Sequence, residues 1–214
     1  QDKLTSWVKQ GHEIASHHHS PYHPGQWDGY TNLLPREFAS LGRRMSDFNG
    51  SLDDWYTLVS LVAPGVKSGC SNDESDKRSL HDRILYDTCS GFTTNGAYEV
   101  GTRAKGDDPL SGANDFILVG KVNGIERKWL GHAIVGGTLM QSAQDAFKTM
   151  DGGAYGIVLH TNDFDKTALE TWIEFLKKDP ETRSATLSEI IESGELPERT
   201  IDDETLNRVY PPER

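Results

Sequence analysis

The sequence lacks several features that would point to particular classes of protein. No apolar run is long enough to span a bilayer, and no internal repeat is visible. Basic residues are outnumbered, 22 against 33 acidic residues, and the formal net charge of −11 argues against a nucleic-acid partner, because such a partner requires clustered Lys and Arg. The two cysteines, Cys70 and Cys89, lack the paired spacing of a zinc site and fit a disulfide or two buried thiols equally well. What remains is the composition of one ordinary globular domain of 214 residues.

Chemically reactive side chains are concentrated in residues 11–23, Gly-His-Glu-Ile-Ala-Ser-His-His-His-Ser-Pro-Tyr-His, which hold five of the eight histidines. Ile14 and Ala15 suit a buried strand that ends at the imidazoles. Neutral imidazole suits zinc and similar divalent ions, and a catalytic zinc site typically has three protein ligands and a water. The candidate metal ligands are therefore His17, His19 and His23. The alternative is a solvated His-rich loop that binds metal only adventitiously.

Residues 154–160, Ala-Tyr-Gly-Ile-Val-Leu-His, form a second informative segment. The apolar residues predict a strand that delivers His160 to its carboxyl end, where α/β folds carry their chemistry. His160 is therefore a candidate catalytic residue, and the alternative is a histidine that caps the strand through a local backbone contact. His132, in the predicted strand 129–135, is a further candidate for the same face.

The rest of the chain predicts alternating helices and strands. Apolar residues at helical spacing predict helices over 1–10, 35–48, 76–88 and 138–150, and another after Asp165. Further strands are expected over 56–63 and 116–119, with an Asn-Gly hairpin signal at 122–125. This alternation implies an α/β fold with a mainly parallel sheet.

Loops and helix ends are marked by polar residues. Residues 66–78 and 101–115 are expected to be surface loops, and Asp53-Asp54 and Asp107-Asp108 to be solvated turn residues. Thr186-Leu-Ser-Glu189 is a capping box, which predicts a short helix ending near Gly194. The acidic, Pro-rich segment from about 195 is expected to be a poorly ordered tail.

The segment from Gly11 to His17 resembles the second signature motif of the polysaccharide deacetylases (carbohydrate esterase family 4, the NodB-homology domain). In that family a Gly-His-Glu-Ile strand leads into His-(Ser/Thr)-x-x-His, whose two histidines bind the metal. Counting from Gly11 makes His17 the first ligand, but the second then falls on Pro21. His19-Ser-Pro-Tyr-His23 fits the ligand spacing, so His17 and His19 both remain candidates for the first ligand and His23 is the second.

Two weaker matches extend the resemblance. Leu159-His160 resembles the fifth motif, whose histidine is the general acid. Trp129 is the nearest match to the tryptophan that the fourth motif brings into the active-site wall, and a core tryptophan is the alternative. Trp129 and Tyr22 are the candidate substrate-binding residues. The resemblance implies a distorted (β/α)7 barrel over residues 1–194, followed by the acidic tail over 195–214.

Two family motifs are not matched. The Asp-Asp pair of the first motif, which supplies the catalytic base and a metal-binding carboxylate, has no counterpart before the histidines. Val62-Ala-Pro64 stands where the family has Arg-x-Pro, whose Arg supports that carboxylate. We therefore expect either a fragment of a longer protein, incomplete at its N-terminus, or a divergent relative without the usual base.

The resemblance implies a metal-dependent hydrolase that deacetylates an N- or O-acetylated polysaccharide or oligosaccharide. A divalent ion, Zn with Co or Ni as alternatives, would polarise the acetyl carbonyl and activate water, and His160 would protonate the leaving group. The expected partner is the acetylated glycan, and the expected location is extracellular, periplasmic or at the cell envelope. The alternative, from another class, is a catalytically silent glycan-binding or assembly domain that keeps the barrel and part of the metal site. A hydrolase for another carbon–nitrogen bond is a third possibility.

Overall fold

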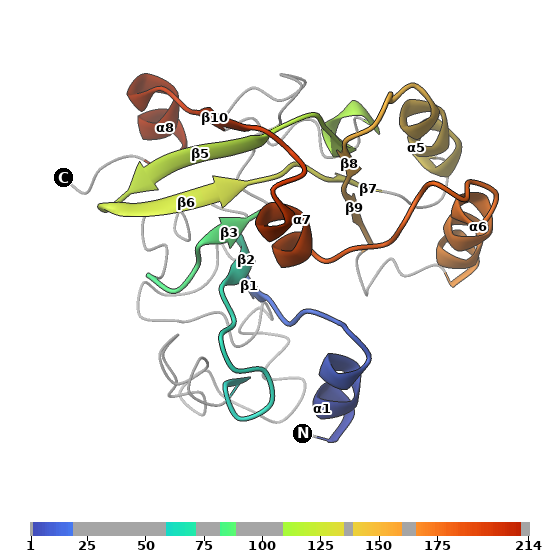
Figure 1. Cartoon of the computed structure of the whole chain (residues 1–214), viewed down its shortest axis with the longest axis horizontal. Coiled ribbons are helices and arrows are strands. Elements are labelled where there is room, and N and C mark those ends of the chain that lie inside the picture. The colour runs from blue at the N-terminus through green and yellow to red at the C-terminus, as the bar shows by residue number, and fades with distance from the viewer. Residues whose placement is uncertain are drawn as a thin grey trace, which may run out of the picture.

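The computed structural model describes residues 2–18, 59–71, 82–88, 109–134, 139–159 and 166–210 (Figure 1). These residues form a mixed α/β fold around a mostly parallel sheet. The sheet has the strand order β1-β2-β3-β6-β5-β10, and every neighbouring pair is parallel except β5 with β6. The bounds of these strands, in sheet order, are Ser16–His18, Ser68–Ser71, Tyr86–Asp87, Ile125–Trp129, Ile117–Val122 and Glu198–Thr200. The mainly parallel sheet predicted from the sequence is confirmed.

Two small sheets and several helices complete the described fold. β4 (Ala113–Asn114) pairs antiparallel with β8 (Ala154–Tyr155), and β7 (Ala133–Ile134) pairs parallel with β9 (Ile157–Val158). A 3-10 turn, η3 (Pro109–Gly112), precedes β4. The α-helices are α1 (Asp2–Lys9), α5 (Leu139–Lys148), α6 (Lys166–Leu176), α7 (Leu187–Ser193) and α8 (Asp203–Val209). In Figure 1, α5 and α6 lie beside β7, β8 and β9, and α7 lies close to β3.

The two faces of the sheet are covered by different elements. Successive residues of an extended chain point to opposite faces of a sheet, so Trp129 and the adjacent Leu130 belong to different hydrophobic clusters. Trp129 packs with Leu206 and Tyr210 from the C-terminal segment, whereas Leu130 packs with Ile191 of α7. A third cluster joins α5 and α6. The helices near the C-terminus therefore close the core on both faces of the sheet.

Several local predictions are confirmed. The helices expected over 1–10, 138–150 and 186–194 and after Asp165 are α1, α5, α7 and α6. The hairpin at Asn123-Gly124 joins β5 to β6, with positive φ angles of 52° and 77°, as a type I′ turn requires. Within the expected strand over 154–160, residues 154–155 form β8 and residues 157–158 form β9, in two different small sheets, and residue 160 lies outside the described residues. The helix expected over 35–48 lies outside the described residues.

The prediction of a strand over 56–63 is wrong for its described part. Residues 59–63 form a helical turn, in which the backbone N–H of Ala63 donates to the carbonyl of Val59 at 2.8 Å. Both side chains are buried, four residues apart, as one face of a helical turn requires. A short apolar run does not distinguish a strand from a helix. The strand next to β1 is instead β2, a polar Ser-Gly-Cys-Ser segment within the expected loop 66–78.

Four other expectations also fail where the structure describes them. Residues 82–88, expected to be helical, include β3, and residues 109–114, expected to be a loop, form η3 and β4. The poorly ordered tail is wrong for residues 198–210, because β10 pairs with β5 and α8 places Leu206 and Tyr210 in the core. The strand of the histidine segment begins at Ser16, so Ile14 and Ala15 precede it.

Candidate functional site

The histidine-bearing strand β1 is the first strand of the sheet order, and its backbone pairs with β2. His17 lies opposite Cys70, and one position earlier in β2, Gly69 lies opposite Asp87 of β3. The backbone N–H of Thr88, the residue after Asp87, donates to the carbonyl of Gly69 at 3.2 Å. The row of residues that starts at His17 therefore continues through Cys70 towards Thr88, at the carboxyl end of three parallel strands.

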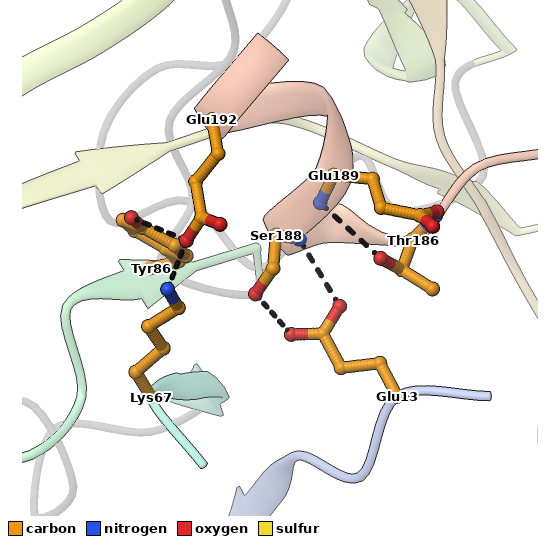
Figure 2. Close-up of polar contacts among 7 residues, drawn as sticks. All are labelled: Glu13, Lys67, Tyr86, Thr186, Ser188, Glu189 and Glu192. Carbon is orange, nitrogen blue, oxygen red and sulfur yellow. Dashed lines mark hydrogen bonds and ion pairs between the residues drawn. The ribbon is translucent and has the colours of Figure 1, made fainter. Parts of the chain in front are cut away.

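The segment that leads into β1 is held by the start of α7 (Figure 2). The carboxylate of Glu13 accepts a hydrogen bond from the backbone N–H of Ser188 at 3.0 Å and another from the Ser188 hydroxyl at 2.5 Å. The predicted capping box is also present, with the Glu189 N–H donating to Thr186 Oγ1 at 3.2 Å and the Thr186 N–H donating to Glu189 Oε2 at 2.8 Å. Glu13 thus satisfies a helix-terminal N–H that the capping box leaves unpaired.

The other end of α7 is held by Lys67, which directly precedes β2, and by Tyr86 of β3. Glu192 forms an ion pair with Lys67 and accepts a hydrogen bond from the Tyr86 hydroxyl at 3.0 Å (Figure 2). The hydrogen bond from Lys67, followed by that from Tyr86, lowers the pKa of Glu192 below its ordinary value. The same contact with Glu192 raises the pKa of Lys67, and burial followed by the bond to Glu192 raises the pKa of Tyr86. Together with Glu13, these contacts tie α7 to the first three strands of the sheet.

A cavity of about 650 Å³ lies between these elements. It is bounded by residues 10–16, by β2, by Thr88 and by residues 184–189. Ser68 lines the cavity and is fully buried, and its hydroxyl makes no hydrogen bond within the described part of the chain. A buried hydroxyl without a partner carries a free-energy cost.

Thr88 also contacts His132. Nδ1 of His132 lies 2.9 Å from the carbonyl oxygen of Thr88 and 3.0 Å from its Oγ1. The carbonyl of His132 accepts a hydrogen bond from the buried Ser111 hydroxyl at 2.7 Å. The buried Asn114 side chain accepts from the Gly131 N–H at 2.7 Å and donates to the Gly131 carbonyl at 3.0 Å. Both the ring and the backbone of His132 are therefore held in one position.

Of the predicted metal ligands, general acid and substrate-binding residues, the structure describes only His17 and Trp129, and it does not bring these two together. The backbone of His17 lies in β1, whereas His19, His23, Tyr22 and His160 lie outside the described residues. β9 ends at Val158, two positions before His160 in the chain. Among the residues that the structure does describe, no group of three or more His, Cys, Asp and Glu side chains is arranged to hold a metal ion.

Trp129 lies in the core rather than at a surface. It is 1% exposed, and its Nε1–H donates to the hydroxyl of Tyr210 at 2.8 Å. This burial agrees with the alternative interpretation of Trp129 as a core residue. Its place beside Tyr210 shows that the segment after residue 194 is part of the same fold.

Sequence reasoning missed most of the residues that build this region. Thr88 and Asn114 lie in segments without a sequence motif, and Ser188 is visible in the sequence only as part of the capping box. Glu13 stood inside the recognised motif, but its partner is 175 positions away. Cys70 is disulfide-bonded, and the one other cysteine of the sequence is Cys89. A disulfide was one of the two alternatives for the cysteines.

No helix within the described ranges combines the length and the apolar character that a bilayer crossing requires. No protein family, no curated protein and no solved structure matches this chain.

Proposed function

We propose that this chain is a metal-dependent hydrolase that deacetylates an N- or O-acetylated polysaccharide or oligosaccharide. The proposal rests chiefly on the position of β1. β1 contains two histidines and is the first of three parallel strands, β1, β2 and β3. Its carboxyl end, from which the chain continues into the rest of the histidine segment, lies at the same edge of the sheet as Thr88, which lines the cavity. Parallel α/β sheets bind their ligands at the carboxyl ends of the strands.

The proposal assigns the mixed α/β fold to a distorted (β/α)7 barrel of the polysaccharide deacetylase type. The parallel pairings of β1, β2, β3 and β6, and the parallel pairing of β7 with β9, support this assignment. In such a barrel the ends of β1 and β9 face the same rim. The histidine segment and His160 would then meet at one pocket.

The metal would be held by His23 together with His17 or His19, or by all three. Imidazole nitrogen suits Zn, and Co and Ni are alternatives. When bound, the ion supplies a Lewis acid that polarises the acetyl carbonyl and promotes ionisation of water. His160 gives a proton to the leaving amine or alkoxide, and Tyr22 contacts the sugar.

The cavity beside α7 has a mostly apolar lining that carries hydroxyl groups at a few positions. Its volume of about 650 Å³ lies within the range of ordinary small-molecule sites. Hydroxyl groups of Ser68, Thr88 and Thr186 are among its lining side chains. A sugar presents several hydroxyls that pair with groups such as those of Thr88 and Thr186.

Acetate release tests the proposal directly. The whole chain, loaded with Zn, Co or Ni in a non-chelating buffer, is incubated with oligomers of N-acetylglucosamine and with an O-acetylated xylan fragment. We expect turnover that is lost in His160→Ala while the metal content is unchanged. The joint replacement of His17, His19 and His23 by Ala is expected to remove both metal and turnover.

Two other outcomes would overturn the proposal. Binding of the oligomers without acetate release would instead favour a silent glycan-binding domain. A wild-type chain that holds no metal after loading would exclude metal-dependent chemistry of this kind.

A further inference from the structure

We propose that Glu13 is a positioning residue of the metal site, and that its contact with Ser188 raises the affinity of the histidine segment, residues 11–23, for its metal. The inference rests on the proposed hydrolase function and deepens it, because it names what holds the metal ligands in place. In this role the carboxylate neither binds the metal nor takes a proton. It acts through the backbone that it anchors.

The chain just before β1 depends on contacts with other elements for its position. Residues 12–15, between α1 and β1, form neither a helix nor a strand. Ile14 packs against the core cluster that contains Trp129. The side chain of Glu13 extends to the first turn of α7 (Figure 2). β1 itself has three residues, so it offers few backbone hydrogen bonds of its own, and the anchor that precedes it contributes to its position.

The contact between Glu13 and Ser188 is well suited to this role. The backbone N–H of Ser188 donates to Oε2 of Glu13 at 3.0 Å, and the hydroxyl donates to Oε1 at 2.5 Å. Because each oxygen has its own donor, the two bonds fix the rotation of the carboxylate as well as its distance from α7. Hydrogen bonds to an ionised acceptor are also stronger than those between neutral groups. At the other end of α7, Glu192 pairs with Lys67 and Tyr86, so the helix is itself anchored.

Metal binding is sensitive to such an anchor. His17 follows Glu13 by four positions in the chain. Metal ligands must be held close to their productive geometry, and a segment that is free to shift loses part of its binding free energy in becoming ordered. Residues 10–13 and 184–187 both line the cavity, so the same contact also fixes the spacing between these two parts of its wall.

Zinc affinity tests the inference, with zinc alone as the probe. Competition with a chromophoric chelator measures the affinity of the whole chain. Glu13→Ala is expected to lower it by about 10- to 100-fold, the range for outer partners of metal ligands. Glu13→Gln is expected to keep most of the affinity, because its amide oxygen accepts from the Ser188 N–H and its amide nitrogen donates to the Ser188 hydroxyl oxygen. Glu13→Asp keeps the charge but is too short to reach Ser188, and it is expected to behave as Glu13→Ala.

Two controls separate this role from a general loosening of the fold. Glu192→Gln removes the ion pair at the other end of α7 and is expected to leave the zinc affinity unchanged. Ser188→Ala combined with Glu13→Ala is expected to lose no more affinity than Glu13→Ala alone, because both changes act on one contact. In the metal-free chain, the backbone amides of residues 16–18 are expected to exchange with solvent faster in Glu13→Ala than in Glu192→Gln.

Each other outcome decides against the inference or against the proposed function. Unchanged zinc affinity in Glu13→Ala, with a lowered unfolding midpoint, would make the contact merely structural. A loss in Glu13→Gln as large as that in Glu13→Ala would make the carboxylate a ligand or a base, and an equal loss in Glu192→Gln would remove the specificity of the contact. A wild-type chain that binds no zinc overturns both proposals. A wild-type chain that binds zinc but releases no acetate overturns the proposed function alone.

Discussion

Glu13 accepts two hydrogen bonds from Ser188, one from its backbone N–H at 3.0 Å and one from its hydroxyl at 2.5 Å. The contact joins the segment before the histidine strand to the first turn of α7, which packs against the sheet. A carboxylate at this position also interacts favourably with the positive end of the helix. The position of β1 therefore depends on α7, although the two elements are far apart in the sequence.

Replacement of Glu13 by Ala is expected to destabilise the chain. The variant leaves the N–H of Ser188 without its acceptor, and the loss of a helix cap of this kind costs about 1–2 kcal/mol. Glu13→Gln keeps one acceptor oxygen and is expected to lose less. Urea unfolding of the wild type, Glu13→Ala and Glu13→Gln measures the difference. Equal midpoints for Glu13→Ala and the wild type would show that the contact does not contribute to stability.

The ion pair of Glu192 predicts a dependence of stability on pH. The pKa of Glu192 is lowered below its ordinary value of 4.5, chiefly by the hydrogen bond from Lys67. The contribution to stability is therefore complete above that value and is lost as the pH falls through the lower pKa of the folded state. Because Glu192 is about half exposed, we expect less than about 1 kcal/mol.

Glu192→Gln isolates this effect. Its difference from the wild type in free energy of unfolding is expected to be largest near neutral pH and to shrink towards pH 3, and added salt should reduce it as well. Glu170→Gln on the exposed face of α6, whose pair with Lys166 joins residues of one helix, is the control. A difference that is constant with pH would contradict the prediction.

Gly156 is expected to tolerate no side chain. A Cβ there would lie 2.3 Å from the carbonyl oxygen of Gly131, and this backbone atom cannot move without disturbing His132. Gly156→Ala should cost about 1–3 kcal/mol, the usual range for overpacking. Gly120→Ala is the comparison, because its new Cβ would meet the methyl groups of Leu206 at 3.3 Å, which can shift. Thermal unfolding of both variants is the measurement, and the opposite order would contradict the packing shown here.

The hydroxyl of Tyr210 is expected to contribute to the core. Tyr210→Phe leaves the Nε1–H of buried Trp129 without the acceptor that lies 2.8 Å away, and such a loss costs about 1–3 kcal/mol. Tyr86→Phe also removes a hydroxyl that donates a hydrogen bond, but this bond reaches exposed Glu192, which water can solvate instead. The Tyr86 variant should therefore lose less in chemical denaturation. If Tyr210→Phe lost no more than Tyr86→Phe, the C-terminal segment would not be part of the cooperative core.

The sequence alone determined the elements whose signals are local. The capping box at Thr186 predicted the start of α7, Gly194 its end, and Asn123-Gly124 the hairpin between β5 and β6, because these structures depend on the conformational preferences and hydrogen bonds of a few neighbouring residues. The parallel character of the sheet followed in the same way from the alternation of helices and strands.

The tertiary structure decided what depends on distant partners. β2 is polar and β10 lies in an acidic segment, so each is a strand only because a neighbouring strand pairs with its backbone. The segment 198–210 is ordered because Leu206 and Tyr210 pack against Trp129, and no local pattern signals that contact. Likewise, Glu13 meets Ser188 and Thr88 meets His132 only after the sheet has formed, since each contact joins residues that the sequence leaves far apart.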